Sequence, residues 1–87
     1  MTGIPYSVYI LECADGTYYT GITTDLARRI DEHNHSDKGA RYTRARRPVT
    51  LRYHETCTDK SHALKREIAI KRLTRTAKAR LIAQGTP

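Results

Sequence analysis

The sequence predicts an α+β fold, in which a small three-stranded sheet has helices packed on it. Two observations predict this class. Strand-like and helical segments follow one another in the order ββαβαα, which is typical of a small antiparallel or mixed sheet covered by helices. The chain has 87 residues, the length of one domain with a modest core, so we expect a single domain over residues 1–87.

The first two strands are expected to form a β-hairpin. Tyr6 to Cys13 and Thr17 to Thr23 are rich in β-branched and aromatic residues, and Ala14-Asp15-Gly16 between them is a turn signal. The two segments hold four of the six tyrosines of a chain that has no Phe and no Trp. A buried tyrosine hydroxyl must find a partner, so this cluster suggests a functional site as well as a core.

The register of this hairpin decides whether two of its tyrosines share a face. A two-residue turn at Asp15-Gly16 places Tyr9 and Tyr19 on opposite faces. A three-residue loop, closed by a bulge with Gly16 in the left-handed conformation, places Tyr9 opposite Gly21 and both rings on one face. Gly21 then leaves open space beside Tyr9. The hairpin sequence by itself permits both registers.

A helix is expected next, beginning after Thr24 or Asp25, either of which is a good N-cap, and ending near residue 34. On a helical wheel Arg29 and His33 flank the apolar stripe, whereas Arg28 faces water. Arg29 is therefore a candidate site residue. The structural alternative is a stem that lies along the sheet and carries its guanidinium into solvent.

The rest of the chain is predicted to form a loop, a strand and two helices. Residues 35–47 form a polar loop with at most a short helical piece, and residues 49–54 form a third strand of alternating apolar and polar residues. Thr58 or Asp59 caps a second helix that runs to Leu73, and a third helix begins at Thr76 and ends before Gly85.

The second helix carries a glutamate on its apolar arc. The apolar residues of that arc are Ala63, Leu64, Ile68 and Ile70. Glu67 falls among them on a helical wheel. An exposed pair with Lys71 contributes only about 0.3–0.5 kcal/mol, whereas a buried carboxylate without compensation costs far more. Two interpretations remain open: a half-exposed structural pair with Lys71, or a functional carboxylate such as a metal ligand.

The charge distribution predicts a polyanionic partner. Lys and Arg outnumber Asp and Glu by 16 to 9, and every Lys and Arg lies at position 28 or later. One segment suits phosphate contacts and base stacking, and its residues are Lys38, Arg41, Tyr42, Arg44, Arg46 and Arg47. The structural alternative is an ordinary solvated segment, because charge alone fixes no partner. Nucleic acid is the partner that we expect, and a membrane is not expected, since no strongly amphipathic basic helix accompanies the segment.

Other classes of protein and site find no support in the sequence. No apolar run approaches the length of a membrane span and no signal peptide is recognisable, so we expect a soluble cytoplasmic protein. Cys13 and Cys57 form no CxxC pair and are expected to be reduced thiols. The histidines and cysteines do not match a zinc pattern, and there is no P-loop, GxGxxG or GxSxG motif. The sequence carries no signal for oligomeric state.

Four motifs follow one another along the chain. They are Ser7-Val8-Tyr9, Tyr19-Thr20-Gly21, Asp25 to Arg29 with His33, and Ala63 to Glu67 with Ile70 to Leu73. This ordered set resembles the GIY-YIG nuclease superfamily, and most of all its small single-domain bacterial branch of predicted endonucleases. Ser7 and Thr20 stand where the family name has glycine and isoleucine. The late asparagine and the separate DNA-binding domains of larger members have no counterpart here.

The resemblance implies an enzyme, a metal-dependent endonuclease that hydrolyses phosphodiester bonds in nucleic acid, with DNA favoured over RNA. It places Tyr9, Tyr19 and Gly21 in one site, which requires the three-residue hairpin loop. Tyr9 is then our candidate for assisting deprotonation of the attacking water, for which it needs a neighbouring cation.

The same resemblance assigns the charged residues of the site. Arg29 stabilises negative charge on the phosphate, and Glu67 binds one divalent metal ion, Mg²⁺ or Mn²⁺. His33 serves as a proton relay or as a phosphate contact. The alternative is a non-catalytic nucleic-acid-binding or ribosome-associated module, which the basic charge and the tyrosines would serve equally well.

Overall fold

A three-stranded antiparallel sheet forms the centre of the protein. In the computed structural model, which describes residues 4–86, β1 (Tyr6–Glu12) lies between β2 (Tyr18–Thr23) and β3 (Thr50–Cys57). Both neighbours run antiparallel to β1. The helices are α1 (Leu26–His35), α2 (Arg41–Arg44), α3 (Lys60–Lys71) and α4 (Arg75–Gln84). The predicted α+β class and three-stranded sheet are confirmed.

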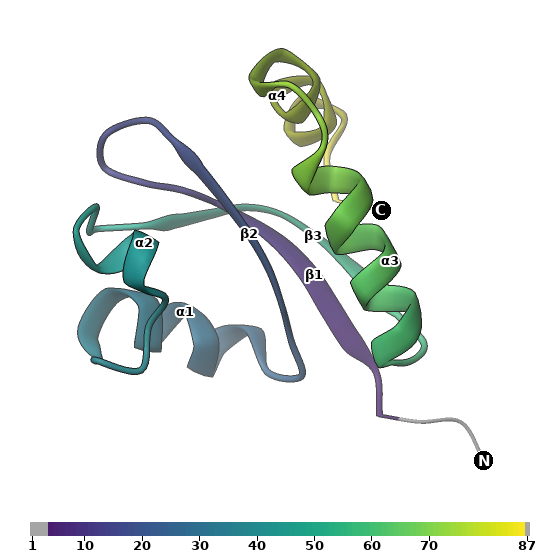
Figure 1. Ribbon diagram of the computed structural model, residues 1–87, viewed down its shortest axis with the longest axis horizontal. Coiled ribbons are helices and arrows are strands. Elements are labelled where there is room, and N and C mark those ends of the chain that lie inside the picture. Colours follow the sequence, from purple (N-terminus) through teal and green to yellow (C-terminus); the bar gives the residue numbers. More distant parts are fainter. Residues whose placement is uncertain (1–3, 87) are drawn as a thin grey trace.

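The helices cover both faces of this sheet. Helices α1 and α2 lie on one side, and α3 and α4 lie on the other (Figure 1). Alternate side chains of β1 therefore enter two different cores. Val8 and Ile10 pack with Ile70 of α3, whereas Tyr9 and Leu11 pack with apolar residues of α1. We call these the α3 face and the α1 face of the sheet.

Side-chain caps fix where the longer helices begin. The Asp25 carboxylate accepts a hydrogen bond from the Arg28 amide at 3.1 Å, and Asp59 accepts one from the His62 amide at 2.8 Å. Both caps are among the predicted ones. The last helix begins at Arg75 rather than Thr76, because Thr74 caps it.

Three sequence-based expectations about β3 and α3 were wrong. Helix α3 ends at Lys71 and not at Leu73. Strand β3 extends beyond His54 to Cys57, because the beginning of β1 pairs with its last residues and continues the ladder. The buried arc of α3 is narrower than predicted, since Leu64 is 40% exposed and Ile68 is 51% exposed. Ala63 and Ile70 alone among the predicted arc residues are buried, because only this part of α3 contacts the sheet.

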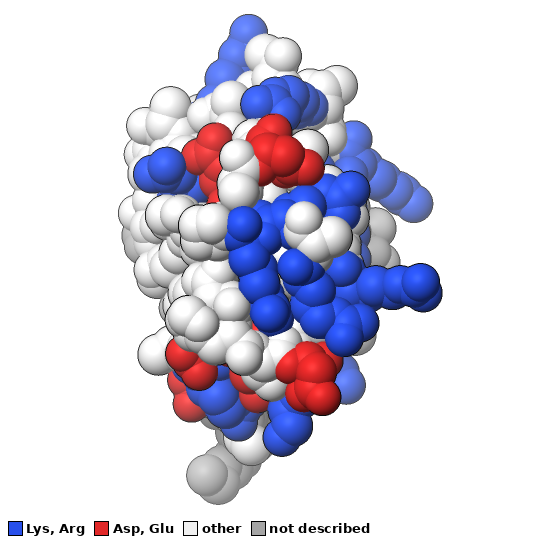
Figure 2. All heavy atoms as spheres, turned by 90° about the vertical axis from the view of Figure 1, so that its left-hand side faces the viewer, with Lys and Arg blue, Asp and Glu red and all other residues white. Residues whose placement is uncertain are grey.

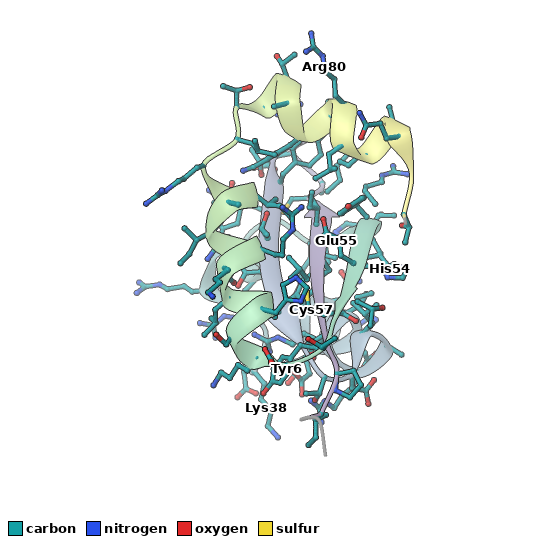
Figure 3. All side chains as sticks on the ribbon, turned by 90° about the vertical axis from the view of Figure 1, so that its right-hand side faces the viewer. Tyr6, Lys38, His54, Glu55, Cys57 and Arg80 are labelled. Atoms are coloured by element: carbon teal, nitrogen blue, oxygen red, sulfur yellow. The ribbon has the colours of Figure 1, made fainter. Side chains whose placement is uncertain are left out.

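Side chains alternate along β3 as they do along β1. Glu55 and Cys57 point toward α3, and His54 points toward the other face of the sheet (Figure 3). Cys57 and Cys13 are both buried and unpaired, as expected from the sequence. Among the helices formed by residues 4–86, none has the length and apolar character needed to cross a membrane.

Candidate active site

The hairpin register brings two tyrosines together on the α1 face. Tyr9 lies opposite Gly21, and Leu11 lies opposite Tyr19. The loop therefore has three residues, and Gly16 closes it with a φ of 82°. The Tyr9 and Tyr19 ring centroids are 6.4 Å apart. The three-residue register is confirmed.

Gly21 makes room for the Tyr9 hydroxyl. A Cβ atom at position 21 would lie 2.5 Å from Tyr9 Oη and 2.7 Å from its Cζ, which is closer than such atoms approach. The Tyr9 side chain therefore lies across the backbone of β2. A glycine in a strand often marks such a close approach.

His33 completes this cluster from α1. Its side chain is fully buried, and its Nε2 lies 2.8 Å from Tyr9 Oη. The ring also meets the edge of Tyr19, at a centroid distance of 5.2 Å. Burial lowers the pKa of His33 to about 4, and the nearby positive charge of Arg29 acts in the same direction. A buried neutral imidazole fits a hydrogen-bonding role, whereas a direct phosphate contact does not fit it.

Burial shifts the pKa of Tyr9 upward, because tyrosine is charged when deprotonated, whereas histidine is charged when protonated. Burial raises the pKa of Tyr9 to about 12, and the neighbouring Tyr19 adds to the effect. Arg29 opposes this rise, and Glu67 contributes to it. Both charged candidates therefore lie near enough to influence the Tyr9 hydroxyl.

Arg29 faces the site, and Arg28 does not. The Arg29 side chain is 25% exposed, and its Nη1 donates to Glu32 Oε1 at 3.0 Å and to the Lys38 carbonyl at 2.8 Å. Arg28 is 60% exposed. The Arg29 guanidinium is partly buried and still accessible to solvent, so its observed position is intermediate between the two that the sequence allowed.

Glu67 is the candidate metal ligand on α3. Its side chain is only 17% exposed, and Oε2 lies 3.5 Å from Lys71 Nζ. No group of three or more His, Cys, Asp and Glu residues within residues 4–86 is arranged to hold a metal ion. A single carboxylate suits Mg²⁺ or Mn²⁺, because these ions keep several waters and take further oxygen ligands from substrate phosphates. The residues present therefore fit an ion that is bound mainly through the substrate.

Tyr42 and Arg46 extend the aromatic cluster rather than standing free. The Tyr42 ring stacks on Tyr19 at a centroid distance of 6.1 Å. The Arg46 guanidinium lies 3.9 Å from the centre of the Tyr42 ring and also pairs with Asp15 at 3.1 Å. These contacts fasten α2 to the hairpin loop.

Arg47 is committed to backbone carbonyl groups. Its guanidinium donates to the carbonyls of Glu32, His33 and Ser36 at the end of α1. Nε and Nη2, which the sequence analysis assigned to phosphate, are therefore already engaged within the protein. Lys38, Arg41 and Arg44 are exposed, and Lys and Arg side chains gather across the middle of the surface that carries α1 and α2 (Figure 2).

An open cleft of about 220 Å³ lies next to the cluster, at the outer edge of β2. Its lining residues are Tyr18, Tyr19, Thr20, Tyr42, Lys71 and Lys78. The sequence analysis did not single out Tyr18 or Lys78. The excess of lysine and arginine in the two C-terminal helices is the signal that points to this second basic area.

Sequence reasoning also missed Thr43, which contacts His33 from α2. Thr43 is fully buried, and its Oγ1 lies 2.9 Å from His33 Nδ1. A small polar residue between arginines gives no periodic signal. Its role depends on how the loop folds back onto α1.

The comparison with known families agrees with this geometry. The GIY-YIG family, described as the GIY-YIG catalytic domain, matches residues 5–80. The chain belongs to the GIY-YIG family. The GIY-YIG superfamily is one of nucleases, and the tyrosines, glycine, arginine, histidine and glutamate named above all lie within the matched residues.

Relatives of this GIY-YIG protein extend over bacteria and archaea. A UPF0213 protein of Desulfotalea psychrophila is 68% identical over 86% of this chain and 68% of its own length. A UPF0213 protein of Halobacterium salinarum is 57% identical over 87% of this chain and 97% of its own length.

Solved structures show the same fold. The solution structure of a UPF0213 protein from Bacillus halodurans is 45% identical, covers 92% of this chain and 84% of its own, and has a TM-score of 0.59. That of a protein from E. faecalis is 40% identical, covers 97% and 90%, and has a TM-score of 0.64.

Proposed function

We propose that this GIY-YIG protein is a metal-dependent endonuclease that hydrolyses phosphodiester bonds in nucleic acid, with DNA as its main substrate. One observation carries the proposal: the buried Tyr9 hydroxyl meets His33 at the backbone of Gly21, within the influence of Arg29 and Glu67. A structural tyrosine does not need a glycine beneath its hydroxyl. A site that moves a proton beside a phosphate needs an ordered proton carrier and a nearby cation, which Tyr9 and Arg29 would supply.

Arg29 is the group that we assign to the phosphate. Its guanidinium is partly exposed and borders the site. The hydrolysis transition state places additional negative charge on the phosphate oxygens, and a positioned guanidinium stabilises that charge. The exposed Lys38, Arg41 and Arg44 extend the positive surface, so they would hold the flanking phosphates.

Tyr9 is the group that we assign to the attacking water. Attack forms a bond from the water oxygen to phosphorus and breaks the bond to one sugar oxygen, so one proton leaves the water and one is taken up by the leaving oxygen. With a pKa of about 12, the Tyr9 hydroxyl is neutral at pH 7. It accepts the proton only in its ionised form, which the charge of Arg29 favours.

Glu67 would hold a single divalent ion, Mg²⁺ or Mn²⁺. When bound, such an ion polarises the phosphate and stabilises the leaving oxygen. The carboxylate is largely buried, has Lys71 as its ion-pair partner, and acts electrostatically on Tyr9.

Cleavage of end-labelled nucleic acid tests this proposal. The native chain, Glu67→Gln and the control Glu12→Gln are compared on single-stranded, duplex and branched DNA and on RNA of the same sequence. Each reaction contains Mg²⁺, Mn²⁺ or EDTA. Glu12 is a suitable control because its partly exposed carboxylate already pairs with Arg52 at 2.8 Å.

We expect metal-dependent products from the native chain and from Glu12→Gln, and a loss of about 100-fold or more in Glu67→Gln, with binding retained. Binding without cleavage of any substrate would favour the non-catalytic nucleic-acid-binding module. Unchanged cleavage by Glu67→Gln would remove Glu67 from the site.

A further inference from the structure

We infer that Thr43 and the backbone amide of Ala40 hold His33 as the neutral tautomer with its proton on Nε2, so that His33 donates a hydrogen bond to Tyr9 Oη. Thr43 is then a positioning residue that acts on Tyr9 through His33. The catalytic meaning of this assignment rests on the proposed function, whereas the tautomer itself does not.

The decisive contact is made at the other nitrogen of the ring. The Ala40 amide N–H points at His33 Nδ1, with a nitrogen to nitrogen distance of 3.2 Å. A backbone amide can only donate, so Nδ1 must accept and carries no proton. In a neutral imidazole the proton then lies on Nε2, which faces Tyr9 Oη at 2.8 Å.

Thr43 contacts the same ring nitrogen from a second direction. Its Oγ1 lies 2.9 Å from His33 Nδ1 and 2.8 Å from the Ala40 carbonyl oxygen. A threonine hydroxyl has one proton and can direct it to either acceptor. With Nδ1 unprotonated, that proton is attracted to the imidazole as well as to the carbonyl, and the ring stays in one orientation.

The surroundings of His33 oppose a charged imidazolium. The ring is fully buried between Tyr9 of β1, Tyr19 of β2 and Thr43 of α2. Of the charged groups near it, Arg29 and Arg47 disfavour the cation and Glu32 favours it. A second ring proton, on Nδ1, would also face the Ala40 amide proton, which leaves Thr43 Oγ1 as its acceptor.

The loop that follows α1 holds Ala40 and Thr43 against this helix. A Cβ at Gly39 would lie 2.5 Å from the Glu32 carbonyl oxygen and 2.8 Å from His33 Cα. Only glycine permits this approach of the loop to the helix. Arg47 fastens the other end of the loop, because it donates to the Glu32 and His33 carbonyls. Part of the basic segment thus shapes the site from behind.

This arrangement has a direct consequence for Tyr9. A protonated Nε2 cannot accept the Tyr9 proton, so His33 is not the base that deprotonates this hydroxyl. The Tyr9 proton must instead point away from His33. If Tyr9 ionises, the donated hydrogen bond from His33 stabilises the phenolate together with Arg29.

Nitrogen NMR of the full chain tests the tautomer without any activity. Long-range ¹H–¹⁵N correlation identifies which ring nitrogen of His33 carries the proton, in the native chain, in Thr43→Val, in Thr43→Ser and in the control Thr50→Val. Thr50 is exposed on β3, so its replacement should leave the ring unchanged. Cleavage is measured on the same four proteins.

We expect the native ring to be protonated on Nε2 alone at pH 7. Thr43→Val should shift the Nδ1 resonance and reduce cleavage by about tenfold, since Nδ1 then keeps the Ala40 amide but loses the hydroxyl that helps to orient the ring, and Thr43→Ser should restore both. A native ring protonated on Nδ1 would overturn the inference, and so would a normal His33 spectrum in Thr43→Val. If no protein cleaves, the NMR result still decides the tautomer, and only the proposed function fails.

Discussion

The two faces of the sheet each bury a tyrosine, and the two tyrosines differ in what surrounds their hydroxyl groups. On the α3 face, Tyr53 donates to Glu55 at 2.6 Å, and Arg66 binds both oxygens of that carboxylate. On the α1 face, Tyr9 has His33 as its hydrogen-bond partner and lies across Gly21. One hydroxyl is enclosed in a complete ion-pair network, and the other is not.

The pKa values of the two hydroxyls do not separate these roles. Burial raises the pKa of Tyr53 to about 12, helped by the hydrogen bond to Glu55. Arg66 acts against this rise. Burial raises the pKa of Tyr9 to about 12 as well, and there Arg29 acts against it. A shifted pKa therefore does not identify a site by itself, and neither does the sign of the neighbouring charges.

Removal of the two hydroxyls should produce the largest difference between the faces. Tyr9→Phe should reduce cleavage by about 100-fold or more, because it removes the group assigned to the water. Tyr53→Phe should leave cleavage nearly unchanged and lower the free energy of unfolding by about 1 kcal/mol, since Arg66 still satisfies Glu55. Cleavage assays and urea unfolding of both variants measure this. Equal losses of activity would show that the faces are not functionally distinct.

The buried histidine should make stability depend on pH on the α1 face. The pKa of His33 is about 4 in the folded chain, against about 6.5 when unfolded. The unfolded chain therefore binds its proton first, so the stabilisation is complete above pH 6.5 and is lost as the pH falls toward 4. The full loss is about 3 kcal/mol.

Unfolding free energies measured between pH 7 and 4 test this dependence. The native chain and His35→Gln should lose stability in parallel, because His35 is exposed on the same helix. His33→Gln should show a flatter dependence. A slope for His33→Gln equal to the native one would mean that His33 is not buried in neutral form.

A smaller effect is expected when the close approach on the α1 face is disturbed. Gly21→Ala places a methyl group against Tyr9 Oη and Cζ, so the ring must move away from His33. A displacement of this kind should reduce cleavage by about tenfold to 100-fold. The control Thr50→Ala alters an exposed residue of β3 and leaves the hairpin unchanged. A Gly21→Ala protein with native activity would show that the position of the Tyr9 ring is not critical.

Local patterns were enough to predict the two hairpin strands, the caps of α1 and α3, and the helix face of Arg29. They failed where the outcome depends on distant partners. The end of β3 is set by pairing with the beginning of β1, and the exposure of Leu64 and Ile68 depends on how far α3 reaches across the sheet. Neither outcome can be predicted from the residues of the segment itself.

The same limit applies to the candidate site. The resemblance suggested its residues. Nothing in the local sequence shows that Arg47 donates to carbonyl groups or that Thr43 contacts His33. Both depend on a loop that folds back onto α1 at Gly39. The basic segment therefore has two kinds of residue: exposed ones that face solvent, and buried ones that support the histidine.

The hairpin loop has a consequence for how such a sequence can change over time. Its three residues determine that Tyr19 shares a face with Tyr9. Insertion or deletion of a single codon there would turn one of these rings to the opposite face while every residue of the site remained encoded. Selection would thus act on the length of this loop as strictly as on the tyrosines, although no loop residue needs to touch the substrate.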